Sequence, residues 1–437
     1  MKKNKQFFNI ILIITALAWL FYSFVSIYNY SISCGRKDFR CQVVGSRLLL
    51  TNENIYFYEW KDGDDTYLLD NGDNNIAPMN YVTMNPFYLI FGLPFALLTY
   101  SDGIWAWFAW NYCLVGLILY LIKKIYPNLK ASHLLYIFSF CIIGSSAWWW
   151  HAVEGQKYMT FSALLALIFW FGFHKKNGFW TGIVVCVLVA FRLNIGLSAI
   201  LLLFLIDKNM QSAYLKGVFC GVFLIGGLSF SFSTIEDWKS YFQAMKLWSK
   251  WGIGELALNS VETTYNLTSL EGVNNIEKGL SSSDFPKALA HNNSSIQRWV
   301  FKITAIKIPK SVMISIYIFL SVFLVAYYLN KTKQAIREHN YILFIIIYIF
   351  SEYFLPVHRL SYYYVQWFFP ILIYLSSFNL KIFTASKIFF CIGIILSSML
   401  LSFIPFGQIL SEVSIVIAFL IMIYNPFKVD NIIYELK

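Results

Sequence analysis

The chain has 437 residues, of which 58% are hydrophobic and 13% are charged, and its formal net charge is +11. A soluble protein of this length carries about 25% charged residues, so the composition excludes an ordinary soluble domain. No basic stripe alternates with aromatic residues, so the positive charge does not indicate a nucleic-acid-binding protein. Much of that charge lies in short loops, where it orients membrane helices. We therefore expect an all-α polytopic membrane protein without a nucleic-acid partner.

The N-terminal apolar run covers residues 7–29 and follows Met1-Lys-Lys-Asn-Lys. The run is too long and too aromatic for a secretory signal, and no small-residue cleavage site follows it. We interpret it as a retained helix whose basic start lies in the cytoplasm.

Alternating apolar runs and lysine-bearing turns predict about 12 membrane spans (range about 10–13), with both termini cytoplasmic. The expected spans are residues 7–29, 104–122, 132–150, 158–173, 178–191, 194–206, 216–231, 311–329, 341–356, 363–379, 388–405 and 409–424. Residues 87–100 are short and contain Pro94. We predict a juxtamembrane or re-entrant segment there, because this places Lys123-Lys124 inside.

The domain organisation follows from these spans. Residues 1–437 form one transmembrane domain with two extracytoplasmic loops. The first covers residues 31–103 and contains juxtamembrane helices, and the second covers residues 232–309. No internal repeat is evident.

Polar residues converge at the outer ends of the predicted helices. They are Asp38, His151, Glu154, Gln156, Lys157, Arg192, His358 and Arg359. Ionisable groups at membrane depth are costly and tend to face a cavity. An outer cavity with acids and several cations suits an anionic lipid headgroup, or chemistry at that headgroup.

Each of these residues also has a structural explanation. Arg192 could extend its side chain to the interface from a helix end, and His151 follows Trp148-Trp149-Trp150, which is typical of an interfacial belt. Asp38 could form a surface ion pair with Arg36 or Arg40, which contributes little.

Several motifs carry a family resemblance. In chain order they are Asp38-Phe39, Gly45-Ser-Arg47-Leu-Leu-Leu, Asn54-Ile-Tyr56, Asn85-Pro86-Phe87, Glu154-Gly155-Gln156, Gly182…Arg192, Asn292-Asn293-Ser294-Ser295-Ile296 and Ser361-Tyr-Tyr-Tyr…Phe369-Pro370. Their order resembles that of the bacterial polyprenyl-phosphate-dependent mannosyltransferases of glycosyltransferase family 87, in the GT-C superfamily. The chain departs from the usual pattern at Asn85, Tyr158 and Arg192, which leaves the substrate less defined than the reaction type.

The resemblance implies a GT-C-like fold and an integral membrane glycosyltransferase that works at the extracytoplasmic face. It would move a mannose-like hexose from a polyprenyl-monophosphate donor to a glycan or glycolipid acceptor, among membrane lipids. Asp38 matches the position of the family's general base. We expect Arg192, His358, Arg359 and Lys157 to bind the donor phosphate, and Gln156, Glu154, Tyr56 and His151 to bind the sugar or the acceptor. A monophosphate donor needs no metal, and we expect no cofactor.

Two other functions stay open on the sequence. A polysaccharide polymerase or ligase would use a pyrophosphate-linked donor and rely on outer-loop arginines rather than an acid. A lipid-linked sugar transporter or flippase would carry polar groups through the membrane midplane and would show inverted repeats.

The two cysteines that flank Asp38 form a separate question. Cys34 and Cys41 would lie about 10 Å apart in a continuous helix, too far for a disulfide. A Cys34–Cys41 disulfide therefore requires a bend between them.

Overall fold

The computed structural model describes residues 2–34, 37–51, 53–58, 63–65, 68, 82–129, 142–252, 295–297, 300, 304, 306, 308–331, 337–355, 361–376, 384–398 and 407–424. Five helices in these ranges are long and apolar enough to cross a membrane, within Asn9–Asn29, Tyr100–Ile125, Lys208–Phe232, Lys310–Asn330 and Gly407–Tyr424. Shorter apolar helices accompany them. The expectation of an all-α polytopic membrane protein is confirmed.

The described helices follow one another in chain order. Those of the first half are α1 (Lys2–Cys34), α2 (Lys37–Leu48), α3 (Pro86–Ala96), α4 (Tyr100–Ile125), α6 (Ser146–Glu154), α7 (Tyr158–Phe169), the π-helical turn η2 (Trp170–His174), α8 (Gly178–Phe191), the 3₁₀ turn η3 (Leu193–Ile195), α9 (Gly196–Leu205), α10 (Lys208–Phe232) and α11 (Ile235–Gly252). Those of the second half are α15 (Lys310–Lys331), α16 (Arg337–Phe354), the 3₁₀ helix η6 (Ser361–Trp367), α17 (Phe368–Ser376), α18 (Thr384–Ser397) and α19 (Gly407–Tyr424).

The predicted pair of short apolar runs on either side of Arg192 agrees with the helices of the structure. Residues 178–191 are α8, and residues 194–206 correspond to η3 and α9. The predicted span 132–150 differs, because the chain breaks at Ser145. The Ser145 hydroxyl accepts a bond from the Trp148 N–H at 3.1 Å and so begins a new helix, α6. Residues 130–141 lie outside the described ranges.

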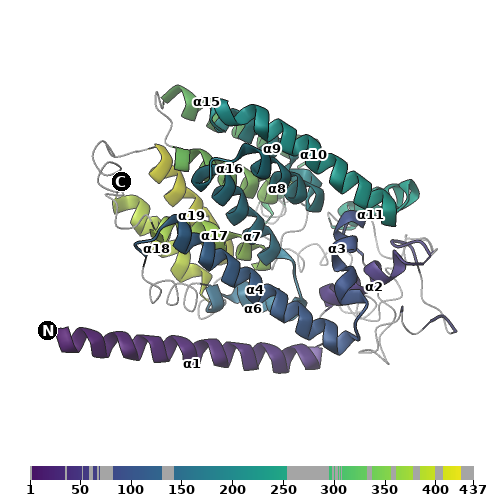
Figure 1. Cartoon of the computed structure of the whole chain (residues 1–437), viewed down its shortest axis with the longest axis horizontal. Coiled ribbons are helices and arrows are strands. Elements are labelled where there is room, and N and C mark those ends of the chain that lie inside the picture. The colour runs from purple at the N-terminus through teal and green to yellow at the C-terminus, as the bar shows by residue number, and fades with distance from the viewer. Residues whose placement is uncertain are drawn as a thin grey trace.

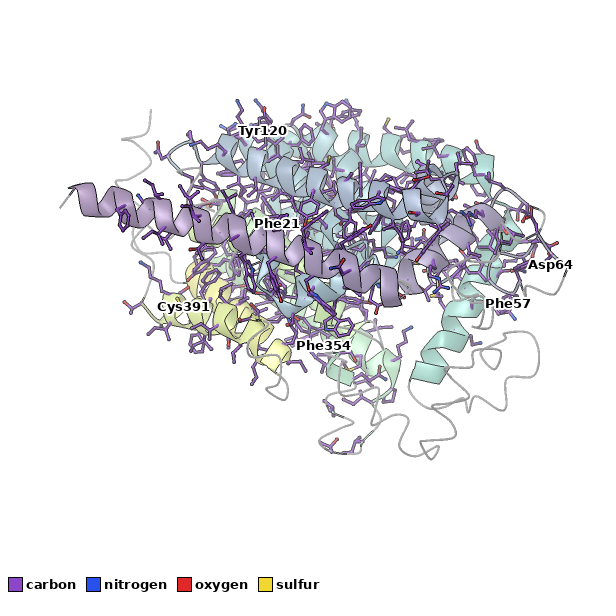
Figure 2. The ribbon with its side chains drawn as sticks, turned by 90° about the horizontal axis from the view of Figure 1, so that it is seen from below. Phe21, Phe57, Asp64, Tyr120, Phe354 and Cys391 are labelled. Carbon is purple, nitrogen blue, oxygen red and sulfur yellow. The ribbon has the colours of Figure 1, made fainter. Side chains whose placement is uncertain are left out.

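The segment 87–100, expected at the membrane surface, contains α3. Its 11 residues make a helix of about 16 Å, roughly half the thickness of the hydrocarbon core. Figure 1 shows α2, α3 and α11 gathered at one end of the helical body, on the right of the view. Figure 2 shows Phe57 and Asp64 at this same end and Cys391 of α18 near the opposite one.

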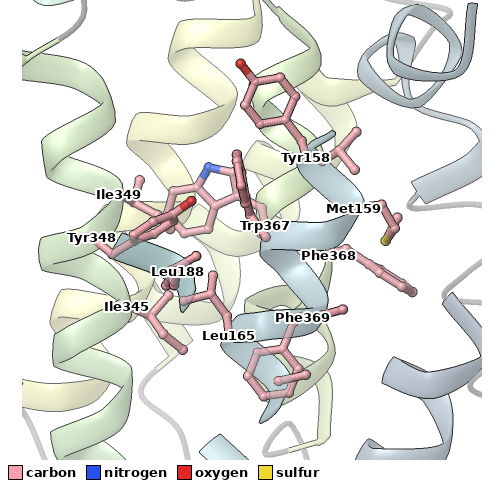
Figure 3. Close-up of a cluster of buried hydrophobic side chains, with 14 of the residues drawn as sticks. Tyr158, Met159, Leu165, Leu188, Ile345, Tyr348, Ile349, Trp367, Phe368 and Phe369 are labelled. Atoms are coloured by element: carbon pink, nitrogen blue, oxygen red, sulfur yellow. The ribbon is translucent and has the colours of Figure 1, made fainter. Parts of the chain in front are cut away.

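The core lies where α7, α8, α16, η6 and α17 meet, and Figure 3 shows its side chains. Tyr158 lies at the upper edge of the cluster, with its hydroxyl directed away from Trp367 and Tyr348. Long apolar side chains cover the outside of the body instead, as expected where lipid replaces water. Phe21 of α1, labelled in Figure 2, is 71% exposed.

Some expectations concern residues outside the described ranges. These residues are His358 and Arg359, the sequence Asn292-Asn293-Ser294, and Arg36. The side chain of Cys34 lies outside them as well. Cys41 is a buried thiol that forms no disulfide in the structure, so the Cys34–Cys41 disulfide is not borne out.

Candidate functional site

Helix α2, which carries Asp38 in its first turn, is fastened to α3 by polar contacts. The Arg47 guanidinium donates to the carbonyl oxygens of Ala96 at 3.0 Å and Leu98 at 3.1 Å. Both carbonyls lie at the C-terminal end of α3, where backbone acceptors lack partners within the helix. The Ser46 hydroxyl also donates to the Leu89 carbonyl at 2.8 Å. These bonds hold α2 across α3 and thereby set the place of Asp38.

The turn between α6 and α7 approaches α2 at a glycine. Gly155 has φ +68°, in the left-handed region that favours glycine. A Cβ there would lie 2.4 Å from the Phe39 Cβ, far inside contact distance. The Gln42 amide donates to the Gly155 carbonyl at 3.2 Å, which adds a bond across this junction. The motif Glu154-Gly155-Gln156 therefore lets the turn pack directly against the residue that follows Asp38.

This packing brings Asp38 and Gln156 together. The Gln156 side-chain amide donates to the Asp38 carboxylate oxygen Oδ2. Gln156 is buried at 4% exposure, whereas Asp38 is half-buried. A half-buried carboxylate held by a buried amide is oriented.

Lys157 follows directly and lies outside the apolar helices. Its ammonium stands over the Tyr88 ring, 4.3 Å from the ring centroid. Burial, together with the nearby Arg192 charge, lowers the pKa of Lys157 to about 7, while Asp38 and Glu352 oppose this shift. Lys157 is therefore within electrostatic reach of two carboxylates and a second cation.

Arg192 lies in the turn between α8 and η3, and its side chain is only 10% exposed. It forms an ion pair with Glu352 of α16, and its other terminal nitrogen donates to the Tyr158 hydroxyl at 2.8 Å. The rings of Tyr158, Phe161 and Tyr363 lie 4.9–5.1 Å from the guanidinium carbon. Burial disfavours the charge, but Glu352 together with Tyr158, Tyr363 and Tyr348 more than offsets this effect and raises the pKa of Arg192 well above its usual value. The residue is thus a buried cation rather than one that extends to the interface.

A second tether joins this turn to α3. The Asn85 side chain caps α3 by accepting from the Tyr88 N–H at 2.9 Å, and its amide donates to the Ala190 carbonyl at 2.7 Å. Ala190 is two residues before Arg192. The structure thereby links α2, α3 and the end of α8 into one frame.

We call Asp38, Gln156, Lys157, Arg192 and Glu352 the charged cluster. Four of these residues were selected from the sequence. Glu352 was missed, although a lone acid near the end of the apolar run 341–356 was a usable signal. Tyr88, which faces Lys157, had no comparable signal in the sequence.

The other site candidates from the sequence that the structure describes are not part of the charged cluster. His151 is fully buried, stacks on Trp148, and accepts from the Met159 N–H at 3.3 Å. Tyr56 is buried, and its hydroxyl donates to the Met84 carbonyl at 2.8 Å. Its ring packs against Tyr241 of α11 with centroids 5.6 Å apart. Glu154 is the half-buried last residue of α6.

A family model matches part of the chain that holds the charged cluster. Residues 83–274, which include α3 to α11, match the model of Glycosyltransferase family 87. Over this segment, which is less than half of the chain, the match confirms the resemblance predicted from the sequence.

The matched segment contains Gln156, Lys157 and Arg192, whereas Asp38 precedes it and Glu352 follows it. No curated protein and no solved structure matches the chain. The roles of individual residues therefore depend on the geometry described above.

Proposed function

We propose that the protein transfers a hexose from a polyprenyl-monophosphate donor to a hydroxyl of a glycan or glycolipid acceptor, with Asp38 as general base. The observation that carries this proposal is the charged cluster itself. A half-buried carboxylate, oriented by Gln156, lies in the same electrostatic neighbourhood as the cations Lys157 and Arg192. Transfer from a phosphate donor needs both kinds of group.

The reaction divides into bond formation and bond cleavage. The acceptor oxygen attacks the anomeric carbon, and the bond from that carbon to the phosphate oxygen breaks. The electron pair of this bond leaves with the phosphate, and the acceptor proton passes to Asp38. A positioned base of this kind contributes about 10²–10⁴-fold to a rate.

The departing phosphate gains negative charge, which a fixed cation stabilises better than water does. Arg192 is suited to this role because a guanidinium grips phosphate with parallel N–H donors. Its contacts to Glu352 and Tyr158 use one N–H on each terminal nitrogen. Among the described residues the other N–H groups have no hydrogen-bond acceptor, so we assign them to the phosphate. Lys157 supplies a second, more compact charge, and we extend the same role to His358 and Arg359.

Sugar and acceptor contacts come from the walls of the cluster. The Gln156 amide has a second N–H besides the one given to Asp38, and it suits a sugar hydroxyl. Helix α11 brings Tyr241 within electrostatic reach of Arg192, and Tyr241 packs on Tyr56. We assign Tyr56 to the acceptor side through this contact, Glu154 to the rim, and His151 to the support behind Tyr158.

The proposed active site faces the extracytoplasmic side of the cell inner or plasma membrane, with both termini in the cytoplasm. This orientation rests on the lysines of the predicted inside turns. It would place the first loop, residues 31–103, and the second loop, residues 232–309, around the site.

The class of sugar donor distinguishes the proposed transferase from a polymerase or ligase and from a flippase. Purified protein would be given radiolabelled polyprenyl-monophosphate hexose, the pyrophosphate-linked sugar, or neither, together with membrane glycolipid acceptors. We expect label to move to the acceptor from the monophosphate donor. Transfer from the pyrophosphate donor alone would indicate a polymerase or ligase instead. Movement of intact donor across a vesicle bilayer without cleavage would indicate a flippase.

A further inference from the structure

Glu352 is the one member of the charged cluster that the proposed reaction does not use. Its side chain is 1% exposed and contacts Arg192 through Oε2. The other oxygen, Oε1, has no hydrogen-bond partner among the described residues. A buried ion pair offsets the desolvation of its two charges only when its remaining polar atoms are also hydrogen-bonded. The unpartnered oxygen of Glu352 therefore needs an explanation.

The two ends of this ion pair differ in how firmly the fold holds them. Arg192 lies in a turn, with φ −142° and ψ 87°, between α8 and η3. Glu352 lies in α16, whose residues from Tyr341 to Ile349 are all buried.

Side-chain bonds fix α16 on both sides of Glu352. The Tyr348 hydroxyl donates to the Gln366 side chain of η6. The Tyr353 hydroxyl donates to Glu412 of α19 at 2.7 Å, and the same carboxylate oxygen accepts from Trp367 at 2.9 Å. A rigid helix thus presents an acid to a cation that the turn alone would leave free to rotate.

The aromatic contacts of Arg192 do not replace this constraint. Tyr158, Phe161 and Tyr363 surround the guanidinium, and stacking on rings fixes the plane of a cation better than its rotation within that plane. The directional contacts are those to Glu352 and to the Tyr158 hydroxyl.

From these observations we propose that Glu352 is a positioning residue, which sets the direction in which Arg192 meets the anionic phosphate of a sugar donor. This inference rests on the proposed function. It assigns Glu352 no contact with the reacting atoms.

The test is Glu352→Gln in the purified full-length protein, with kcat and the donor KM measured separately. Loss of the acid leaves Arg192 charged but poorly aimed, so we expect kcat to fall about tenfold. The site gains one positive charge, so the donor KM should fall as well. A purely structural defect reduces the amount of active enzyme and leaves KM unchanged.

Glu338→Gln is the control, since it makes the same change at a half-buried carboxylate in the first turn of α16, where Glu338 accepts from the Tyr126 hydroxyl and does not contact Arg192. We expect it to leave both constants unchanged. The same divergence of kcat and KM in Glu338→Gln would overturn the inference.

A double-mutant cycle isolates the action through Arg192. Adding Glu352→Gln to Arg192→Gln should change kcat no further. Full additivity of the two losses, or wild-type kcat and KM in Glu352→Gln, would overturn the inference.

If Glu352→Gln does not fold, Glu352→Asp keeps the charge but is one methylene shorter, and we expect lower kcat with unchanged KM. Wild-type kcat in Glu352→Asp would then overturn the inference.

A failure of the proposed function would look different. Wild-type protein would then use another donor, and the same cycle is measured with that donor. Coupling of Arg192 and Glu352 on a pyrophosphate-linked donor would refute the monophosphate assignment and leave Glu352 as the positioning residue.

Discussion

A methyl group on Gly155 would lie 2.4 Å from the Cβ of Phe39, the residue that follows Asp38. The turn between α6 and α7 therefore approaches α2 closely, because Gly155 has no side chain to hold it away from Phe39. The catalytic proposal depends on this approach, because it places the Gln156 amide at the Asp38 carboxylate.

We predict that Gly155→Ala abolishes most transfer activity. The new methyl both clashes with Phe39 and strains a left-handed backbone, at a cost of about 1–3 kcal/mol. Movement of Asp38 by about 1 Å should lower kcat about 100-fold. The measurement is transfer by detergent-purified protein, expressed per amount of folded enzyme. Gly116→Ala in α4 is the control, since a Cβ there meets nothing within 4 Å, and it should retain full activity.

A second prediction concerns the tether between α2 and α3. Arg47→Met removes both bonds to the C-terminal carbonyls of α3 and should lower the free energy of unfolding by about 2 kcal/mol. Thermal unfolding in detergent checks this. Lys239→Met is the matched control, because Lys239 is exposed and its pair with Glu236 is solvated; such pairs contribute about 0–1 kcal/mol. Equal shifts in the two variants would contradict the tether.

The pKa of Lys157 gives a prediction about pH. Its value is about 7 in the folded protein and 10.5 in the reference state. Between these values the unfolded chain binds a proton that the folded protein does not, so the free energy of unfolding rises with pH across this window. Below pH 7 the cost of burying the charge is fully present.

Lys157→Met should therefore be more stable than wild type near pH 6, with the difference shrinking as the pH rises toward 10. Thermal unfolding across this range measures it. The groups that face Lys157 are Asp38, Tyr88, Arg192 and Glu352. Lys246→Met, at an exposed position of α11, should keep the wild-type slope. A Lys157→Met curve parallel to wild type at every pH would contradict the assignment.

The sequence predicted the fold class and the short pair around Arg192, because apolar run length and lysine-bearing turns are local signals. It did not predict the break at Ser145. A serine inside an apolar run is compatible with a continuous helix. The run alone does not show that the Ser145 hydroxyl accepts from the Trp148 N–H and so begins a new helix.

The charged cluster could be predicted only in part, because the sequence shows its residues but not the long-range contacts that bring them together. Asp38, Gln156, Lys157 and Arg192 were visible as polar residues at the ends of apolar runs. Their pairing was not visible, because it depends on long-range contacts such as Asn85 to Ala190 and Gly155 to Phe39. The pairing of Glu352 with Arg192 was hidden because the two residues lie 160 positions apart, so neither charge indicates the other along the chain.

The most direct test of the central claim is single-turnover transfer by Asp38→Asn with saturating polyprenyl-monophosphate hexose, together with separate measurement of donor binding. The amide keeps the shape of the side chain and a carbonyl oxygen for Gln156, but it cannot take the acceptor proton. We predict that donor affinity stays within about twofold of wild type while the transfer rate falls at least about 100-fold. Transfer at the wild-type rate in Asp38→Asn would contradict the role of Asp38 as base.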